Sequence, residues 1–451
     1  MNGKRVESPP FVLSPSKDSA NRFWRPVNSA QSTAQSARMD RFIEWYSRAV
    51  FAFLLVSVAW LGIGAVEISP SGAGLSAWSI SRTTFFFWLI LKLLIAIRTR
   101  QWRTNLFKSA IPFSLLLFFV VVAISLLPDF HQAGDFRYFA LGCAHALMIM
   151  DLCQEERRSY WLLLLIGLLP GLLVIRGILH DSSVFNLHYT RRLGFPLDHP
   201  NTAGYLFSMS IPLAIGLALF EKGWWRGLSI LSAAAQLCGL ALTYSRGAWI
   251  GGLAALLFLA VAQKSWKAIG IFVIGLLLVF AIAAPLRDRL LTLRNPQADI
   301  AMNERMQVIQ DAVRLGKEHP VLGIGYGRGR LKEALRPIYR GTANESNPIW
   351  HAHNVYVELF AETGILGLGV FLWLLGRGGF EILRQAHSET KGRRTLLYGL
   401  GAAWIGAAVT GFGDVPFYHH ETRILFFTIL ALIFCLAKKT PVTTVGVGLP
   451  G

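Results

Sequence analysis

The amino-acid sequence predicts an all-α protein that crosses a membrane about twelve times. Three observations support this fold class. The mean hydropathy is +0.45, with 53% hydrophobic and only 16% charged residues, which is typical of a polytopic membrane protein. Twelve apolar segments approach the roughly twenty residues that a helix needs to cross the hydrocarbon core. The short segments between them alternate between rich and poor in Lys and Arg.

The predicted spans fall into two groups along the chain. Nine lie within residues 49–285 and three within 351–438, with a polar loop at 286–350 and tails at 1–48 and 439–451. The spans are expected at 49–66, 76–97, 110–127, 138–152, 160–179, 203–220, 227–243, 248–261, 268–285, 355–375, 396–412 and 424–436. Within the loop we expect an amphipathic helix at 303–317, a flexible glycine-rich turn, and a short helix at 330–336.

The distribution of cations predicts the orientation. Lys and Arg in short loops are retained in the cytoplasm during insertion, and they are concentrated in loops such as 98–108 and 155–158. Both termini are therefore expected in the cytoplasm and the loop 286–350 in the periplasm. That loop carries eleven Lys and Arg against seven Asp and Glu. It is either a solvated loop, since long loops escape the rule, or a segment that binds an anion.

Composition also bears on the partners. The net charge of +18 is explained by cytoplasmic cations beside anionic lipid headgroups, so membrane lipids are expected as partners and nucleic acid is not. The four cysteines lie in or beside apolar segments without CxxC spacing and are interpreted as small core residues. We expect no cofactor.

Arginines are the first candidate functional residues on the predicted outer face. Arg191 and Arg192 precede a proline-rich turn, Arg246 lies in a very short turn between two spans, and Arg305 lies in the loop helix. Guanidinium groups bind phosphate oxygens bidentately and stay charged. The alternative for Arg246 is a side chain that extends from the membrane interface to water. Asn201, after the turn, is expected only to cap the next helix.

Histidines are the second group. His351 and His353 directly precede a span, and a neutral imidazole has a pKa suited to taking a proton from a hydroxyl group. His353 suits this role better, because Asn354 and the helix start fix its position, which leaves His351 as a positioning residue. The alternative is a capping histidine without chemistry. Asp414, His419 and His420 fall on the same side without an assigned role.

A metal site is the weaker interpretation of these histidines. His351, His353, His419 and His420 could supply zinc ligands, but the HEXXH spacing is missing and no acidic pattern suits magnesium. We expect a metal-independent protein. Glu358 and Glu362, one helical turn apart inside the tenth span, are expected to have a packing or lipid-facing polar role.

Four motifs in order resemble the O-antigen ligase and polymerase superfamily of membrane glycosyltransferases. They are RRLGFPLDHPNTAGY at 191–205, Ser245-Arg246-Gly247, the Arg305 helix followed by HPVLGIGYG, and HAHNVYVELFAETGILGLG at 351–369. The resemblance implies that Arg191 and Arg305 contact the pyrophosphate of a lipid-linked donor, with Arg192 as a one-position alternative to Arg191. It also implies that His353 activates the acceptor. Arg246, His351 and Asn354 are further candidate substrate-binding residues.

The resemblance further implies the reaction and its place. An O-antigen ligase would transfer the glycan from undecaprenyl pyrophosphate to a hydroxyl of lipid A core oligosaccharide, at the periplasmic face of a Gram-negative inner membrane. The transfer would be inverting and metal-independent. A polymerase would use another lipid-linked glycan as acceptor; the span number and the position of the large loop favour the ligase. A transporter or flippase of a lipid-linked glycan is a third class, disfavoured because ionisable residues are scarce in the middle of the spans.

Overall fold

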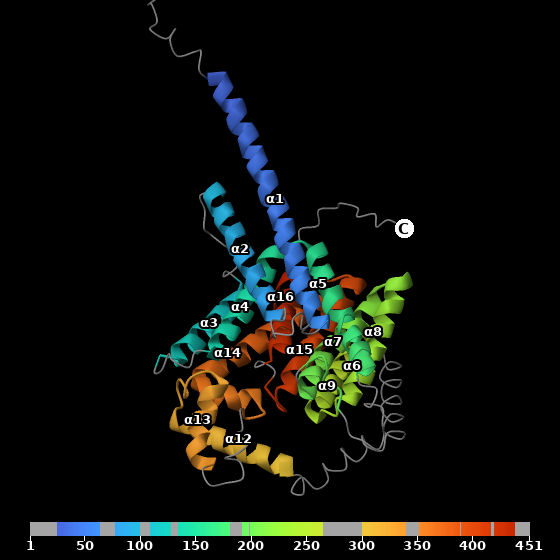
Figure 1. Ribbon diagram of the computed structural model, residues 1–451. Helices are drawn as coiled ribbons and strands as arrows, with labels where there is room; N and C mark the ends of the chain where they lie inside the picture. Colours follow the sequence, from blue (N-terminus) through green and yellow to red (C-terminus); the bar gives the residue numbers. More distant parts are fainter. Residues whose placement is uncertain are drawn as a thin grey trace, which may run out of the picture.

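The computed structural model describes residues 25–63, 77–99, 109–127, 134–180, 192–197, 199–264, 300–339, 351–387, 389–415 and 419–437. Within these residues the regular elements are all helices, which confirms the predicted all-α class (Figure 1). The ninth predicted span, at 268–285, lies outside the described residues, as do Arg191 and Asp198.

Each predicted span within the described residues corresponds to helical structure. The helices before the polar loop are α1 (Arg25–Ile63), α2 (Ala77–Thr99), α3 (Ala110–Ser125), α4 (Gly134–Leu152), α5 (Glu156–Leu168), α6 (Pro170–His180), α7 (Pro200–Phe220), α8 (Gly223–Leu242) and α9 (Arg246–Ala262). Both predicted loop helices are present as α12 (Ile300–Glu318) and α13 (Arg328–Tyr339). They are followed by α14 (Val355–Ala386), α15 (Lys391–Thr410) and α16 (His420–Ala437).

Many of the helices have the length and composition of membrane spans. Seven segments of the described chain are long and apolar enough to cross a bilayer, and α3 and α9 are shorter apolar helices. The largest differences from the predicted boundaries are at α1, at the fifth span and at α14, which continues to Ala386 beyond the expected end at residue 375. Helix α1 begins at Arg25, before the expected start at residue 49, and the fifth predicted span is divided into α5 and α6 at Pro170. Proline has no N–H to donate to the preceding turn, so helical hydrogen bonding is interrupted there.

Helix α15 packs against α7 and α9 in the middle of the bundle. Small residues allow the close approach: a Cβ on Gly251 of α9 would lie 1.9 Å from Oγ1 of Thr410 and 2.9 Å from the carbonyl oxygen of Gly406. Helices in lipid associate through such close packing, because lipid removes the hydrophobic driving force between them. Helix α16 completes the core, with 89% of its 18 residues buried.

Helices α12 and α13 lie together at one end of the bundle, and the N-terminal part of α1 extends beyond the other end (Figure 1). The apolar face of α12, formed by Val308, Ala312 and Leu315, packs with Ala352 and Ala361 next to the start of α14. The predicted amphipathic helix is thus placed against the span that follows the predicted histidine pair.

Helix α14 is not continuous. At Gly364 its backbone has φ 65° and ψ −166°, which is not helical, so the helix consists of a short part at 355–363 and a longer part at 365–386. We call residues 355–363 the histidine leg, because this part of the helix begins two residues after His353. The break lies in an apolar run in which the sequence predicts one uninterrupted span.

Candidate active site

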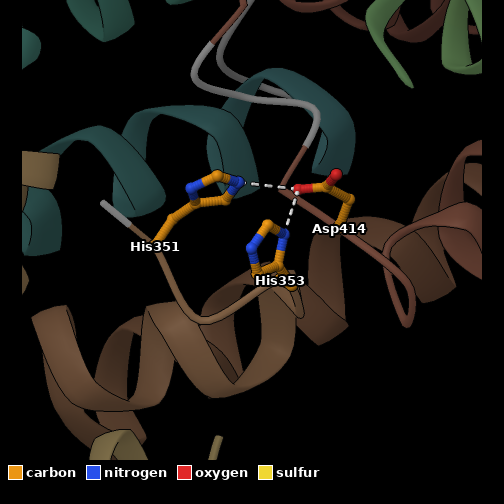
Figure 2. A group of neighbouring side chains, drawn as sticks. All are labelled: His351, His353 and Asp414. Carbon is orange, nitrogen blue, oxygen red and sulfur yellow. Dashed lines mark hydrogen bonds and ion pairs between the residues drawn. The ribbon is translucent and has the colours of Figure 1, made fainter. Parts of the chain in front are cut away.

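A buried carboxylate, Asp414, joins the two histidines at the end of the bundle where α12 and α13 lie. Nε2 of His351 donates to Oδ1 of Asp414 at 2.9 Å, and Nδ1 of His353 lies 3.4 Å from the same oxygen (Figure 2). The imidazole rings are 4.2 Å apart between centroids. The side chain of Asp414 is 3% exposed, whereas both histidine side chains retain about a fifth of their surface, 22% for His351 and 21% for His353.

The histidine pair is held by the start of α14. The side chain of Asn354 caps the helix, accepting hydrogen bonds from the backbone N–H groups of Tyr356 and Val357 at 3.0 and 3.1 Å. His353 itself has φ 52°, a left-handed conformation that costs a residue with a side chain of the order of 1–3 kcal/mol. The surrounding contacts must therefore impose it, which is a feature of residues whose position matters for chemistry.

Glu358 fixes the backbone between the two histidines. Its carboxylate accepts a hydrogen bond from the backbone N–H of Ala352, and the backbone N–H of Val355 donates to the carbonyl of Gly411 at 2.8 Å. Glu358 and Glu362 are 1% and 0% exposed, so the lipid-facing alternative for them is wrong and the packing alternative holds. Burial of Glu358 is compensated by this hydrogen bond to residues 351–354, which we call the histidine loop.

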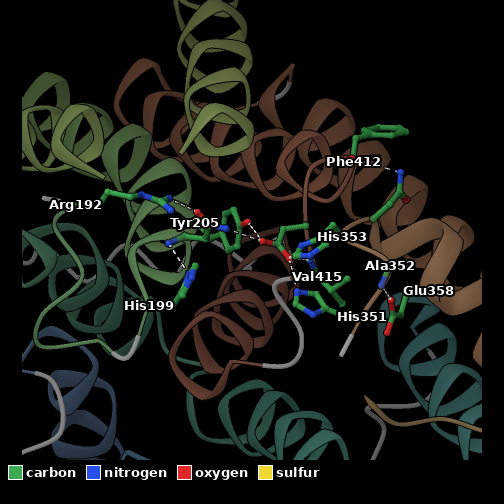
Figure 3. A network of polar contacts seen from close by, with 12 residues as sticks. Arg192, His199, Tyr205, His351, Ala352, His353, Glu358, Phe412 and Val415 are labelled. Atoms are coloured by element: carbon green, nitrogen blue, oxygen red, sulfur yellow. Dashed lines mark hydrogen bonds and ion pairs between the residues drawn. The ribbon is translucent and has the colours of Figure 1, made fainter. Parts of the chain in front are cut away.

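The second oxygen of Asp414 is bound from α7. Oδ2 accepts hydrogen bonds from Nδ2 of Asn201 at 3.0 Å and from the hydroxyl of Tyr205, and both side chains are buried (Figure 3). The backbone N–H of Val415 donates to Oδ1 at 2.8 Å. The expectation that Asn201 caps the helix is wrong, because His199 is the cap and accepts from the N–H of Asn201 at 3.1 Å. Asn201 instead uses its side chain to reach Asp414.

Arg192 extends this network on the side away from the histidines. Its Nη2 donates to Oδ1 of Asn201 at 2.5 Å and its Nε to the carbonyl of Thr243 at 2.8 Å. The guanidinium group therefore ties the segment before α7 to the end of α8. This engagement with protein acceptors favours a positioning role for Arg192.

Burial and neighbouring charges set the electrostatics. Burial lowers the pKa of His353 below its ordinary value of 6.5; nearby Asp414 opposes this shift, while His351 and Arg305 add to it. Burial alone would raise the pKa of the Asp414 carboxyl, but the two histidines hold it well below its usual range. The site thus combines an ionised Asp414 with a His353 that is neutral near pH 7.

The other predicted residues are only partly placed. Arg305 on α12 is near enough to the cluster for its charge to lower the pKa of His353 and of His199. Arg246 begins α9, and the adjacent Gly247 packs against Gly413, one residue before Asp414. Arg191 lies outside the described residues. Sequence reasoning assigned no role to Asp414 and did not single out Tyr205; the only sequence signal for Asp414 was its place on the same predicted side as His353.

His351, His353 and Asp414 also form a group that could hold a metal ion. One ligand atom from each of His351, His353 and Asp414 lies within 4.8 Å of the others, a spacing that suits a cation. Both oxygens of Asp414, however, already accept hydrogen bonds from protein groups. The cluster fits a hydrogen-bonded carboxylate and imidazole pair better than a metal site.

One family model matches the chain at this site. Residues 231–372 match the model described as O-antigen ligase. This part of the chain is similar to the O-antigen ligase family, and we call residues 231–372 the O-antigen ligase domain. This O-antigen ligase domain contains α9, α12, α13 and the histidine pair, whereas Asn201 and Asp414 lie outside the matched residues.

Two curated proteins are similar to part of the chain. Exopolysaccharide production protein ExoQ of Rhizobium meliloti is 27% identical over 247 residues, which are 51% of this chain and 55% of that protein. The O-antigen ligase of Salmonella typhimurium is 26% identical over 193 residues, 40% of this chain and 45% of that protein. The chain thus spans about half the length of these relatives.

Proposed function

We propose that the protein is an O-antigen ligase that transfers a glycan from undecaprenyl pyrophosphate to a sugar hydroxyl of lipid A core oligosaccharide. One observation carries this proposal: a His353 imidazole whose Nδ1 faces a buried, ionised Asp414, close to Arg305, in a chain with an O-antigen ligase domain. A base beside a cation is what transfer to a hydroxyl from a pyrophosphate donor requires.

The proposed reaction assigns a role to each group. Nε2 of His353 takes the proton of the acceptor hydroxyl, whose oxygen attacks the anomeric carbon of the donor from the face opposite the leaving group. The bond from that carbon to the pyrophosphate oxygen breaks, the configuration inverts, and undecaprenyl pyrophosphate leaves with the electron pair. Asp414 orients the imidazole and stabilises its protonated form. Arg305 and Arg191 are proposed to offset the charge on the pyrophosphate.

The remaining predicted residues have supporting roles in this proposal. His351 shares Asp414 and keeps its carboxylate in place, and Asn354 fixes the helix that follows His353. Arg192 holds Asn201 against Asp414. Arg246 stays a proposed substrate contact. The reaction needs no metal in this account, because the arginines supply the positive charge.

We place the site at the periplasmic face of the inner membrane of a Gram-negative bacterium. The charge distribution of the loops supports this orientation, and so does the position of α12 and α13 at the end opposite the extension of α1 (Figure 1). The donor is already activated when it reaches that face, so no nucleotide is required there.

A polymerase is the second candidate function. The similarity to an exopolysaccharide production protein favours it, because polymer growth would use the same donor bond with another lipid-linked glycan as acceptor. The two functions differ only in the molecule that supplies the hydroxyl.

The deciding experiment uses the purified full-length protein in detergent with undecaprenyl pyrophosphate-linked glycan, with and without lipid A core oligosaccharide. We expect glycan attached to the core without ATP and in excess EDTA, and no product from His353→Ala. Longer glycans on the lipid carrier without core would instead indicate the polymerase. No covalent product under either condition would leave a transporter as the explanation, and activity restored by zinc or magnesium after EDTA would contradict metal independence.

A further inference from the structure

The break in α14 is filled by the backbone of the segment that follows α12. We call residues 319–325 the crossing segment. The N–H of Ile324 donates to the carbonyl of Ala361 and the N–H of Gly325 to that of Glu362, both at 2.9 Å. In return the N–H of Ile365 donates to the carbonyl of Pro320 at 2.8 Å. Groups that a continuous helix would pair internally are thus paired with the crossing segment instead.

Two glycines make this exchange sterically possible. A Cβ on Gly364 would lie 2.2 Å from the carbonyl oxygen of Val321, and a Cβ on Gly323 would lie 2.3 Å from the carbonyl carbon of Glu362. Both glycines also have positive φ, 65° for Gly364 and 68° for Gly323. The φ and ψ of Gly364 are accessible essentially to glycine alone. Each glycine faces the backbone of the other segment, so neither contact can be relieved by rotation of a side chain.

The exchange connects the two elements that carry the proposed chemistry. Arg305 lies on α12, which leads into the crossing segment, and His353 precedes the histidine leg, which ends at the break. Side chains support the same connection: Val308, Ala312 and Leu315 of α12 pack with Ala352 and Ala361, and the ring of Phe360 lies against Gly316. Backbone bonds at one end and apolar packing along the rest leave little freedom for one element to move without the other.

We propose that Gly323 and Gly364 are positioning residues for glycan transfer, which hold α12 and the histidine leg as one rigid unit and so keep Arg305 at a fixed place relative to His353. The role of His353 in this statement rests on the proposed function. The rigid unit itself rests on the hydrogen bonds and the two glycine contacts. Misplacement of a reacting group by about 1 Å costs on the order of 10²-fold in rate, so the connection bears directly on turnover.

The test compares Gly364→Ala and Gly323→Ala with Gly369→Ala, all in the full-length protein. Gly369 is on α14 too, but a Cβ there would meet nothing within 4 Å. Amide hydrogen exchange is followed in peptides that cover residues 319–326 and 351–366, and glycan transfer is measured over a range of donor concentrations up to saturation. In Gly364→Ala and Gly323→Ala we expect both peptides to exchange at least about tenfold faster and kcat to fall at least about tenfold, with little change in donor KM. Gly369→Ala should match the unaltered protein.

Two results would overturn the proposal. One is unchanged exchange in both peptides in Gly364→Ala and Gly323→Ala; the other is faster exchange throughout the protein in both variants, which would mean that the glycines serve the fold as a whole. If only Gly364→Ala destabilises the whole protein, Gly323→Ala decides. Transfer that persists in His353→Ala would remove the proposed base but would leave the exchange result standing, so the two failures are distinguishable.

Discussion

At the scale of single residues, the site depends on one carboxylate with several donors. Asp414 receives His351 and Val415 on one oxygen and Asn201 and Tyr205 on the other (Figure 3). A buried charge of this kind is tolerated only because donors surround it. The orientation of His353 is therefore set by groups on α7 and by the turn after α15, as well as by its own helix.

The pH dependence of kcat/KM tests this electrostatic arrangement. Transfer requires neutral His353, and burial lowers its pKa below 6.5. Activity should therefore fall as the pH decreases, with a midpoint below pH 6.5. Arg305 contributes to the lowered pKa, so Arg305→Gln should move this midpoint to higher pH besides weakening donor use. Arg314→Gln, on the same helix in an exposed pair with Glu318, is the matched control. A midpoint that does not move in Arg305→Gln would contradict the assigned proximity.

At the scale of elements, the start of α14 works as an extended cap. Asn354 satisfies N–H groups of the first turn, and Glu358, one turn into the helix, reaches back to Ala352. The pair explains why a residue with a side chain persists at the positive φ of His353. Asn354 thus binds the first turn of the helix, and Glu358 binds the loop before it.

Glu358→Ala should loosen the histidine loop. The Ala352 N–H is buried and would lose its acceptor, which costs about 1–3 kcal/mol, so the thermal midpoint in detergent and the transfer rate should both fall. Glu358→Gln keeps a carbonyl oxygen at the same place and should retain most of both. Equal loss in the two variants would mean that the negative charge, and not the hydrogen bond, is what the site requires.

Sequence patterns predicted the elements well and their junctions poorly. The spans, α12 and α13 followed from hydropathy and helical periodicity, and His353 followed from its place beside a span. The contact of His351 with Asp414 joins residues 63 positions apart, and that of Asn201 joins residues 213 apart, distances over which periodicity carries no information. The break at Gly364 lies among apolar residues and glycines that are equally common in continuous spans.

At the scale of the whole molecule, the position of the site depends on how closely the central helices pack. Gly247 meets Gly413 where α9 begins and the turn after α15 leads to Asp414, and Gly251 lets the same two helices touch one turn further along. The small residues of this interface therefore set the place of the carboxylate as well as the shape of the bundle.

Gly251→Val should force α9 and α15 apart. The added carbons would overlap Thr410, and overpacking of this kind typically costs about 1–3 kcal/mol, so we expect a lower thermal midpoint together with reduced transfer. Gly376→Val on α14 is the control, because a Cβ there would meet nothing within 4 Å. A normal midpoint with normal transfer in Gly251→Val would mean that the interface can shift without disturbing Asp414.

The burial of α16 and the late position of Asp414 in the chain have a consequence for biosynthesis. A ribosome makes His351 first and Asp414 63 residues later, and α16, with 89% of its residues buried, follows both. The core of the bundle is therefore completed only after the histidine loop has been made. A nascent chain halted after α14 holds His353 without its carboxylate, so the proposed site is incomplete until α15 and the turn after it have been made.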